Sequence, residues 1–270
     1  MSNLIIPASE RQLRARPTPK ETFTESAAMG WRALIKMRRN PEQFFDVIIQ
    51  PFLFTAMFAY IFGGAISGSV QDYLPIVITG ILVQTALTAC MATGVQLRED
   101  MDKGVFNRFR SLPMARMAPL VGPMTADVLR YAIAATLTLL TGFLMGYRPG
   151  GWFWGVAAGW VLVVFSGWSL SWIFAWLGTV ARSAQAVQGI GMMIMFPLTF
   201  LSNAFVPVES MPGWLQWFVN INPVSLVISA VRDLMNDGAF TMQVVWAVVG
   251  CIVVIVIFAP LAVRSYSRKV

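Results

Sequence analysis

The run Trp152–Val180, WFWGVAAGWVLVVFSGWSLSWIFAWLGTV, contains no charged side chain over its whole length. A helix needs about 20 apolar residues to cross the hydrocarbon core of a bilayer, so this run is longer than one crossing requires. A soluble domain of this size does not need an apolar run of this length. We therefore predict that residues 152–180 form a membrane-spanning helix.

Five further runs of the chain have the same character. Asp46 and Arg130 are the charged residues within them, and each stands close to the start of its run. The whole chain is 57% hydrophobic and 12% charged, which points away from a soluble fold. We therefore predict an all-α polytopic membrane protein with six transmembrane helices in one membrane domain, 44–263, and no room for a separate soluble catalytic domain. The predicted spans are residues 44–66, 73–97, 128–146, 152–180, 184–205 and 244–263.

The Lys and Arg residues lie almost entirely on one side of these six spans. Of the 20 in the chain, only Arg148 and Arg232 fall in the segments on the other side. Because loops rich in Lys and Arg stay in the cytoplasm, the asymmetry predicts a multi-pass protein of the cell membrane with both termini cytoplasmic. The net charge of +7 then reflects membrane topology and anionic lipid, and we expect no nucleic-acid partner.

Residues 211–234 form a further apolar stretch that could be taken for a seventh span. Pro212 and Pro223 interrupt it, and it ends in Arg232-Asp233. A seventh crossing would also place the basic residues that follow the last span outside the cell. We predict instead that residues 206–243 form an external re-entrant segment, which is possible where protein or water satisfies the backbone.

The chain before the first span has two parts. Residues 1–20 are polar with three prolines, which predicts a disordered cytoplasmic tail. In residues 21–43, apolar side chains that include Trp31 recur at helical spacing, while Arg32 and Lys36 belong to another face. This pattern predicts an amphipathic helix on the cytoplasmic leaflet, either a lipid anchor alone or a connecting helix that also contacts a cytoplasmic partner. Residues 264–270 form a second cytoplasmic tail.

Several kinds of chemistry lack the residues they need. The chain has no His and no G-x-x-x-x-G-K-[ST] phosphate-binding loop, so we expect it to hold no metal and no nucleotide cofactor of its own. No acidic residue stands near the middle of a span, where a proton-driven carrier needs one. An intramembrane enzyme or a proton-coupled exporter is therefore poorly supported.

The few ionisable groups and thiols within the spans are predicted to be structural. Asp127 and Arg130 are three residues apart, a spacing that predicts an ion pair on a helix surface. Cys90 and Cys251 have no partner nearby in the sequence, which favours small packing residues.

The segment after the second span, EDMDKGVFNRFRSLPMAR at residues 99–116, lies within the predicted cytoplasmic loop 98–127. Gly104 and Pro113 limit a short piece whose apolar residues share one helical face, with Arg108 and Arg110 off that face. Such a piece is either a docking element for a protein partner or a solvated loop whose charges fix the topology.

This segment resembles the first cytoplasmic loop of ABC-2 type transporter permeases, and in particular of the daunorubicin/doxorubicin-resistance permeases of actinobacteria. Further blocks carry the same resemblance over nearly the whole chain. They are WRALIK at 31–36, PEQFFDV at 41–47, GYRPGG at 146–151, FPLTFLSNAFV at 196–206, MPGWLQWFVN at 211–220 and NPV at 222–224. The similarity identifies the family with high specificity, but it says little about which cargo is transported.

The resemblance implies a particular architecture, that of type V exporters. It implies an amphipathic connecting helix before the first span, a coupling helix after the second, and re-entrant helices between the fifth and sixth. It also implies two permease protomers, identical or related, and two separate ABC ATPase subunits that bind ATP and Mg. The chain alone would then not be an enzyme, and its setting would be a bacterial cell membrane.

The resemblance also yields two groups of candidate site residues. ATPase coupling falls to Glu99, Asp102, Gly104, Phe106, Arg108, Phe109, Arg110 and Pro113, with the two Phe as apolar anchors and the charged residues as partner contacts or braces for the loop. Spans two and five would line the two-fold axis, with the candidate pathway residues Gln84, Thr88, Met91, Met192, Met193, Met195, Phe196, Phe200 and Asn203. Flexible Met beside flat aromatic rings suits a planar, amphipathic ligand.

The predicted function is the membrane subunit of an ATP-driven exporter of amphipathic drugs or natural products of the anthracycline kind. Export of an endogenous lipid or secondary metabolite is an alternative. A non-transporting membrane scaffold that docks a soluble partner through the same loop is an alternative from another class. For each pathway residue, the alternative role is packing against lipid or another helix.

Overall fold

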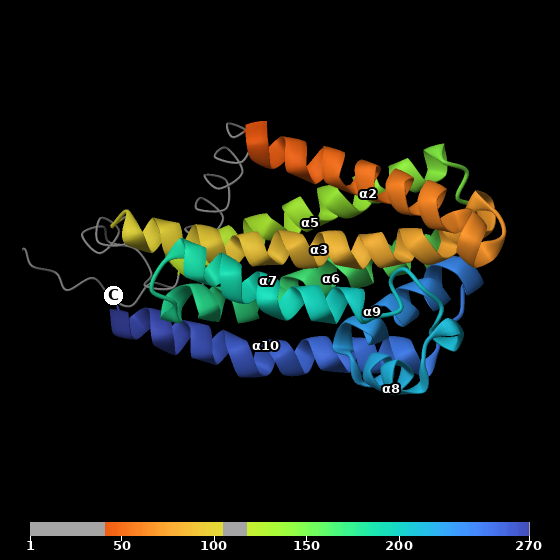
Figure 1. Cartoon of the computed structure of the whole chain (residues 1–270). Coiled ribbons are helices and arrows are strands. Elements are labelled where there is room, and N and C mark those ends of the chain that lie inside the picture. The colour runs from red at the N-terminus through yellow and green to blue at the C-terminus, as the bar shows by residue number, and fades with distance from the viewer. Residues whose placement is uncertain (1–40, 105–117, 270) are drawn as a thin grey trace, which may run out of the picture.

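The computed structural model describes residues 41–104 and 118–269. Six long helices of this part of the chain run side by side in one elongated bundle (Figure 1). They are α2 (Pro41–Ser67), α3 (Val70–Asp102), α5 (Ala118–Leu144), α6 (Trp152–Val180), α7 (Ala184–Phe200) and α10 (Met242–Lys269). The described residues include no β-strand, and the predicted all-α polytopic class is confirmed.

Five of these helices, all except α7, are long and apolar enough to cross a bilayer. α7 is equally apolar but has 17 residues, or about 26 Å of helix, against a hydrocarbon core of about 30 Å. It lies along α3 and α6 in the bundle (Figure 1), and the chain continues beyond its end in non-helical form. α7 together with this continuation forms the sixth element of the bundle.

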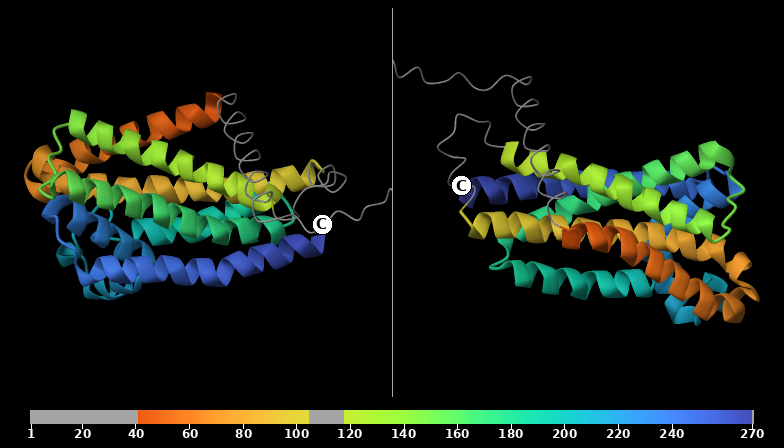
Figure 2. Two further views of the ribbon diagram at one scale, coloured as in Figure 1. Left: turned by 180° about the vertical axis from the view of Figure 1, so that it is seen from behind. Right: turned by 90° about the horizontal axis from the view of Figure 1, so that it is seen from above.

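The two ends of the bundle differ in charge and in structure. At one end α3 finishes, the α6–α7 turn lies, and α10 ends (Figures 1 and 2). We call it the basic end, because it carries Arg98, Lys103, Arg182 and Arg264. At the other end lie the α2–α3 and α5–α6 turns and the short helices of the described residues, with Arg148 and Arg232. We call this the re-entrant end.

The helix predicted for residues 184–205 ends earlier than expected, at Phe200. The cause is local: the Ser202 hydroxyl donates to the Thr199 carbonyl and accepts from the Ala204 main-chain N–H at 3.2 Å. Such side-chain bonds compete with the helical ladder and end it. The non-helical chain is then fixed by Tyr73 of α3, whose hydroxyl donates to the Phe205 carbonyl at 2.6 Å.

The loop predicted for residues 98–127 is also shorter than expected. α3 continues to Asp102, and α5 already begins at Ala118. Lys103 ends α3, and Gly104 follows with a φ of 65°, a left-handed conformation that suits glycine. Gly104 thus breaks the helix where the sequence predicted a break.

The chain between α7 and α10 starts and finishes at the re-entrant end. It contains the 3₁₀ turn η2 (Val208–Ser210), α8 (Gly213–Ile221), α9 (Pro223–Arg232) and the π-helical turn η3 (Asp233–Asp237), with an 82° bend between α8 and the α9–η3 unit. Asn222 forms the corner: its side chain accepts from the Val224 N–H at 2.9 Å and donates to the Leu198 carbonyl at 2.7 Å. The bent pair has the geometry of a re-entrant segment or of a broken span, and the external re-entrant segment predicted for residues 206–243 stays a prediction.

α3 is the central helix of the bundle and contacts α2, α5, α6, α7 and α9. Small residues let α6 approach its neighbours closely. A Cβ on Gly178 of α6 would lie 2.5 Å from the Gly94 carbonyl oxygen of α3. Gly155 and Gly159, four residues apart on α6, face Leu234 and Met235 of the re-entrant segment.

Candidate functional sites

The last turn of α3 holds the described part of the candidate coupling segment. Asp102 pairs with Arg98 at 2.6 Å, and Glu99 pairs with Lys103 at 3.0 Å, each at the i,i+4 spacing of one helical face. The hydrogen bond that Lys103 donates to the Glu99 carboxylate raises the pKa of Lys103 above its ordinary value. Glu99 and Asp102 therefore brace the last turn of α3, and their predicted roles as partner contacts or braces for the loop stay predictions.

Other predicted residues lie outside the described part of the chain. They are Trp31, Arg32 and Lys36 of the expected connecting helix, and Phe106, Arg108, Phe109, Arg110 and Pro113 of the coupling segment. Their roles stay predictions.

Arg98 does more than pair with Asp102. Its side chain is mostly buried, and one guanidinium nitrogen donates to the Ala181 carbonyl at 2.8 Å. Ala181 ends α6, and two residues later Ser183 caps α7 by accepting from the Ala186 N–H. The end of α3 is thus attached directly to the turn that joins α6 to α7.

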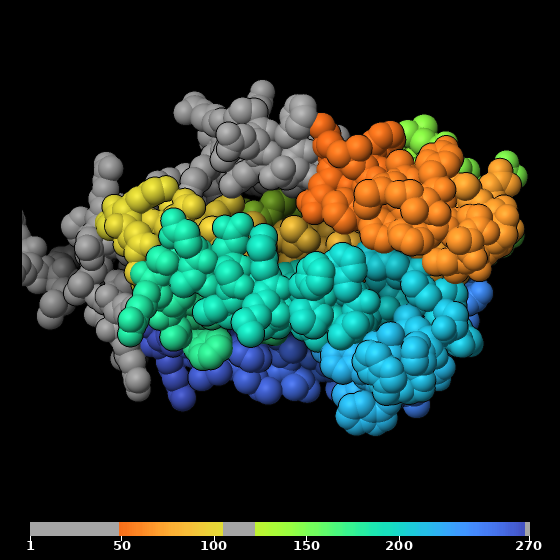
Figure 3. Space-filling view, in the orientation of Figure 1, coloured from red at the N-terminus to blue at the C-terminus, as the bar shows by residue number. Residues whose placement is uncertain are grey.

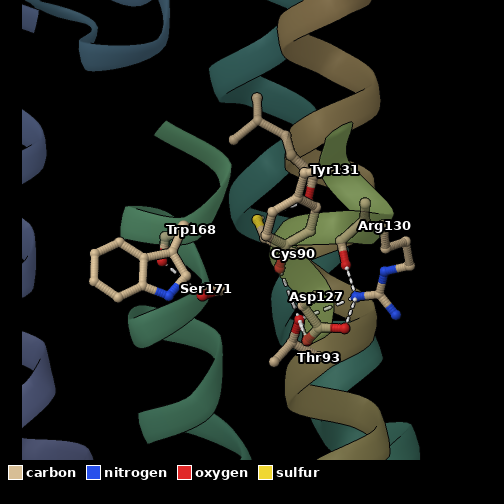
Figure 4. Close-up of polar contacts among 9 residues, drawn as sticks. Cys90, Thr93, Asp127, Arg130, Tyr131, Trp168 and Ser171 are labelled. Atoms are coloured by element: carbon tan, nitrogen blue, oxygen red, sulfur yellow. Dashed lines mark hydrogen bonds and ion pairs between the residues drawn. The ribbon is translucent and has the colours of Figure 1, made fainter. Parts of the chain in front are cut away.

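Asp127 and Arg130 were predicted to pair on a helix surface, and this prediction is wrong in its location. The two side chains pair at 3.1 Å, but Asp127 is 8% exposed and Arg130 is 5% exposed. Both point from α5 towards α3, where they meet Thr93 (Figure 4). Arg130 also donates to the Ala89 carbonyl of α3 at 2.6 Å.

Thr93 is the centre of this buried cluster. Its hydroxyl donates to Asp127 at 2.6 Å and accepts from Arg130 at 3.1 Å. It also lies 2.9 Å from the Tyr131 hydroxyl (Figure 4). Because the Thr93 hydroxyl has one hydrogen and gives it to Asp127, Tyr131 is the donor in the last bond. We call Thr93, Asp127, Arg130 and Tyr131 the α3–α5 brace.

The sequence could have indicated that Asp127 and Arg130 face inward, although the distribution of Lys and Arg along the chain does not show it. Buried charges need partners, because an ion taken out of water without one is costly. An Asp and an Arg inside an apolar span therefore indicate inward-facing polar contacts. Thr93, 34 residues from Asp127, could not be chosen from the sequence alone.

The predicted pathway residues of α7 form an exposed apolar face. Met192, Met193, Phe196 and Phe200 are exposed, and Phe196 reaches 64%. The rings of Phe196 and Phe200 contact each other at a tilt of 30°, with centroids 4.4 Å apart. Figure 3 shows that α7 shares this side of the molecule with α2 and α8. Met195 instead packs against the core.

The predicted pathway residues of α3 lie beside α7. Gln84, Thr88 and Met91 are half-buried. Met91 lies against Gly191 of α7, where a Cβ would come within 2.8 Å of its sulfur. The side-chain oxygen of Gln84 is buried and accepts no hydrogen bond from the part of the chain that the structure describes.

Asn203 does not share the exposed face. It is 3% exposed, beyond the end of α7, and its amide donates to the Ser229 hydroxyl at 2.7 Å. Its main-chain carbonyl accepts from Arg232 at 2.8 Å, so Asn203 connects the end of α7 to α9. These contacts hold the re-entrant segment to the bundle.

Comparison with known proteins bears on this architecture. The profile of the ABC-2 type transporter family matches residues 24–236. The chain is 39% identical over 265 residues to the daunorubicin resistance ABC transporter permease protein DrrB1 of Streptomyces coeruleorubidus, covering 98% of this chain and 92% of that protein. It is 25% identical over 245 residues to the probable doxorubicin resistance ABC transporter permease protein DrrC of Mycobacterium tuberculosis, with 88% and 86% covered. A putative transport permease, ycf38 of Porphyra purpurea, is 26% identical over 245 residues, with 84% and 81% covered.

The chain is a polytopic permease, a membrane-embedded subunit built from one helical bundle. It belongs to the ABC-2 type transporter family. The resemblance noted in the sequence is confirmed by a family match that covers most of the chain.

Proposed function

We propose that this chain is the membrane permease of an ATP-driven exporter that carries planar, amphipathic drugs of the anthracycline kind out of the cell. The observation that carries the proposal is the 39% identity to a daunorubicin resistance permease over 98% of the chain. ATP is bound and hydrolysed by separate ABC ATPase subunits, two per complex, which hold the nucleotide and its Mg. The permease itself supplies the pathway and the coupling contacts.

Coupling begins at the segment that follows α3. When ATP closes the ATPase dimer, the docked segment moves with the ATPase and shifts the end of α3. The pairs Arg98–Asp102 and Glu99–Lys103 stiffen this last turn. The whole of α3 therefore moves with its end, because the last turn does not unwind. Arg98 passes it on to the α6–α7 turn through Ala181. The amphipathic segment before α2 is a second contact for the ATPase.

The cargo pathway runs along α3 and α7. The exposed face of Met192, Met193, Phe196 and Phe200 offers polarizable and aromatic contacts for a flat apolar ring system. The buried, unpartnered oxygen of Gln84 offers an acceptor for a hydroxyl or an ammonium group. A polar atom without a partner is costly inside a membrane, which favours a partner supplied by cargo or by a second protomer.

A second permease protomer completes the pathway. The exposed apolar faces of α2 and α7 lie on one side of the molecule (Figure 3), and α3 lies between these two helices (Figure 1). Two protomers that meet on this side enclose the α3 and α7 residues. The partner is a second copy of this chain or a related permease.

We further propose that the basic end faces the cytoplasm. Support comes from the distribution of charge, since Arg98, Lys103, Arg182 and Arg264 share one end of the bundle. A reporter fused before Met1 or after Val270 should then be cytoplasmic, and one inserted near Ser69 or Met211 should be external. An external carboxyl-terminal reporter contradicts the orientation.

Export of an endogenous lipid or secondary metabolite is the second candidate, and a relative whose name gives no drug, the putative transport permease ycf38 of Porphyra purpurea, is compatible with it.

The subunit role is tested by purification. The permease should copurify in detergent with an ABC ATPase subunit, and hydrolysis should vanish when the phosphate-loop lysine of that subunit is changed. The permease alone should hydrolyse no ATP above background. Robust hydrolysis by this chain alone contradicts the proposal, and the absence of any ATPase partner favours the scaffold alternative.

A further inference from the structure

We infer that the α3–α5 brace is a positioning device that makes the two helices flanking the coupling segment move as one body. The inference rests on the proposed function, because it assigns these residues a part in ATP-driven transport. None of them is expected to touch nucleotide or cargo. They act through the segment between residues 103 and 117.

The position of the brace supports the inference. Thr93 lies nine residues before the end of α3 at Asp102, and Asp127 lies nine residues after the start of α5 at Ala118. At 1.5 Å per residue, both are about 14 Å from the helix ends that flank the segment. The brace therefore joins the two arms of a hairpin at matching heights.

The composition of the brace makes it stiff. It contains a buried ion pair and four hydrogen bonds, and three of these bonds meet at the Thr93 hydroxyl. Sliding α3 along α5 would break these contacts within a dry environment, where an unpaired charge is costly. Leu144 and Leu129 of α5, in contrast, are exposed apolar residues whose contacts are non-directional.

The brace also extends to α6. The Tyr131 ring packs against Gly167, where a Cβ would lie 3.3 Å from the ring. Gly178 of α6 meets Gly94 of α3, the residue next to Thr93. Figure 4 shows α6 passing beside the cluster with Trp168 turned away from it. α6 thus contacts the other two helices at two points about 16 Å apart along its axis, Tyr131 of α5 at Gly167 and Gly94 of α3 at Gly178, and a displacement of the coupling segment moves all three helices.

The experiment measures coupling and not only folding. The complex of permease and ATPase is reconstituted in liposomes, and daunorubicin transported per ATP hydrolysed is compared among variants. Asp127→Asn and Arg130→Gln each remove one charge of the ion pair and leave the other charge buried without its partner. Asp127→Asn combined with Arg130→Gln leaves a neutral pair of similar volume. Thr93→Val removes the central hydroxyl with little change of shape.

A matched control is available on α5. Thr125→Val also removes a hydroxyl, but that hydroxyl is exposed and bonds to the Gly122 carbonyl of its own helix. We expect the control to transport like the original protein. We expect Thr93→Val and each single charge variant to copurify with the ATPase. The amount of drug carried per ATP should nevertheless fall about fivefold or more, since allosteric coupling is typically worth at least that factor. The neutral double variant should recover most of the ratio, because neutral replacement of a buried ion pair is often tolerated.

Each outcome is decisive. If Thr93→Val and the charge variants keep the original ratio of drug to ATP, and only their abundance in the membrane falls, the brace is merely structural and the inference is overturned. If the single charge variants do not reach the membrane, Thr93→Val decides by the same ratio. A complex that carries no daunorubicin refutes the drug assignment separately. The brace is then judged by whether the variants lose the permease-dependent stimulation of the ATPase, which needs no cargo.

Discussion

Arg98 of α3 donates a 2.8 Å hydrogen bond to the main-chain carbonyl of Ala181, the residue that ends α6. One side chain therefore connects the helix end before the coupling segment to the turn that begins α7. The same guanidinium pairs with Asp102, so the connection is held in place from both sides.

Replacement of Arg98 by Met should weaken this connection measurably. A hydrogen bond to a charged group contributes about 1.5–3 kcal/mol, so we expect the free energy of unfolding in detergent to fall by roughly that amount. The matched control is Lys103→Met, which removes the exposed pair with Glu99 and should leave stability unchanged. Equal effects of the two substitutions would contradict the special role of Arg98.

Gly178→Val should disrupt the contact between α6 and α3. A Cβ at this position meets the Gly94 carbonyl of the facing backbone at 2.5 Å, so the helices must separate. Overpacking of this kind costs about 1–3 kcal/mol or more. Thermal unfolding should show a lower midpoint for Gly178→Val, whereas Gly250→Val on α10, with open space around it, should behave like the original protein. A tolerated Gly178→Val would show that the close approach is dispensable.

Phe106→Ala combined with Phe109→Ala should reduce copurification of the ATPase while membrane abundance stays normal. Interface anchors of this type are worth about 2 kcal/mol or more each. Arg108→Ala combined with Arg110→Ala should act in the same direction. Leu140→Ala with Phe143→Ala truncates two exposed apolar side chains of α5 and serves as the control. Full ATPase binding by both test variants would transfer the coupling role to residues 23–39 or to the turn at Arg182.

Much of the bundle could be predicted because long apolar runs have few ways to fold. The run Trp152–Val180 coincides with α6, and Pro212, Pro223 and Arg232 predicted the re-entrant segment. The end of α7 at Phe200 could not be predicted, because apolar composition continues past it. There the bonds of Ser202 to Thr199 and Ala204 decide where the helix stops.

The candidate sites were harder to predict, since they depend on contacts between distant residues. Asp127 and Arg130 look like a surface pair until α3 supplies Thr93 and the Ala89 carbonyl as partners. Asn203 looks like a polar residue of a pathway, but its hydrogen bonds with Ser229 and Arg232 hold it in the buried interior of the bundle. The pathway residues of α7 were predicted as a group because the family resemblance places this span on the two-fold axis, and helical spacing then sets Met192, Phe196 and Phe200 on one face.

Met192→Ala combined with Phe196→Ala should lower drug transport without loss of ATPase binding. Two apolar contacts of about 0.7 kcal/mol each would together lower the rate about tenfold. The control is Ile252→Ala with Val256→Ala, two exposed apolar residues of α10 on another helix. Unchanged transport in the α7 variant would show that this face contacts only lipid.

The most direct test of the account is ATP-driven movement of daunorubicin into inside-out membrane vesicles, followed by the fluorescence of the drug. With permease and ATPase together, we predict accumulation that requires hydrolysable ATP and disappears when the ATPase phosphate-loop lysine is replaced. Vesicles with either subunit alone should accumulate none. Accumulation by the permease alone, or an assembled complex that hydrolyses ATP but moves no amphipathic drug, would contradict the account.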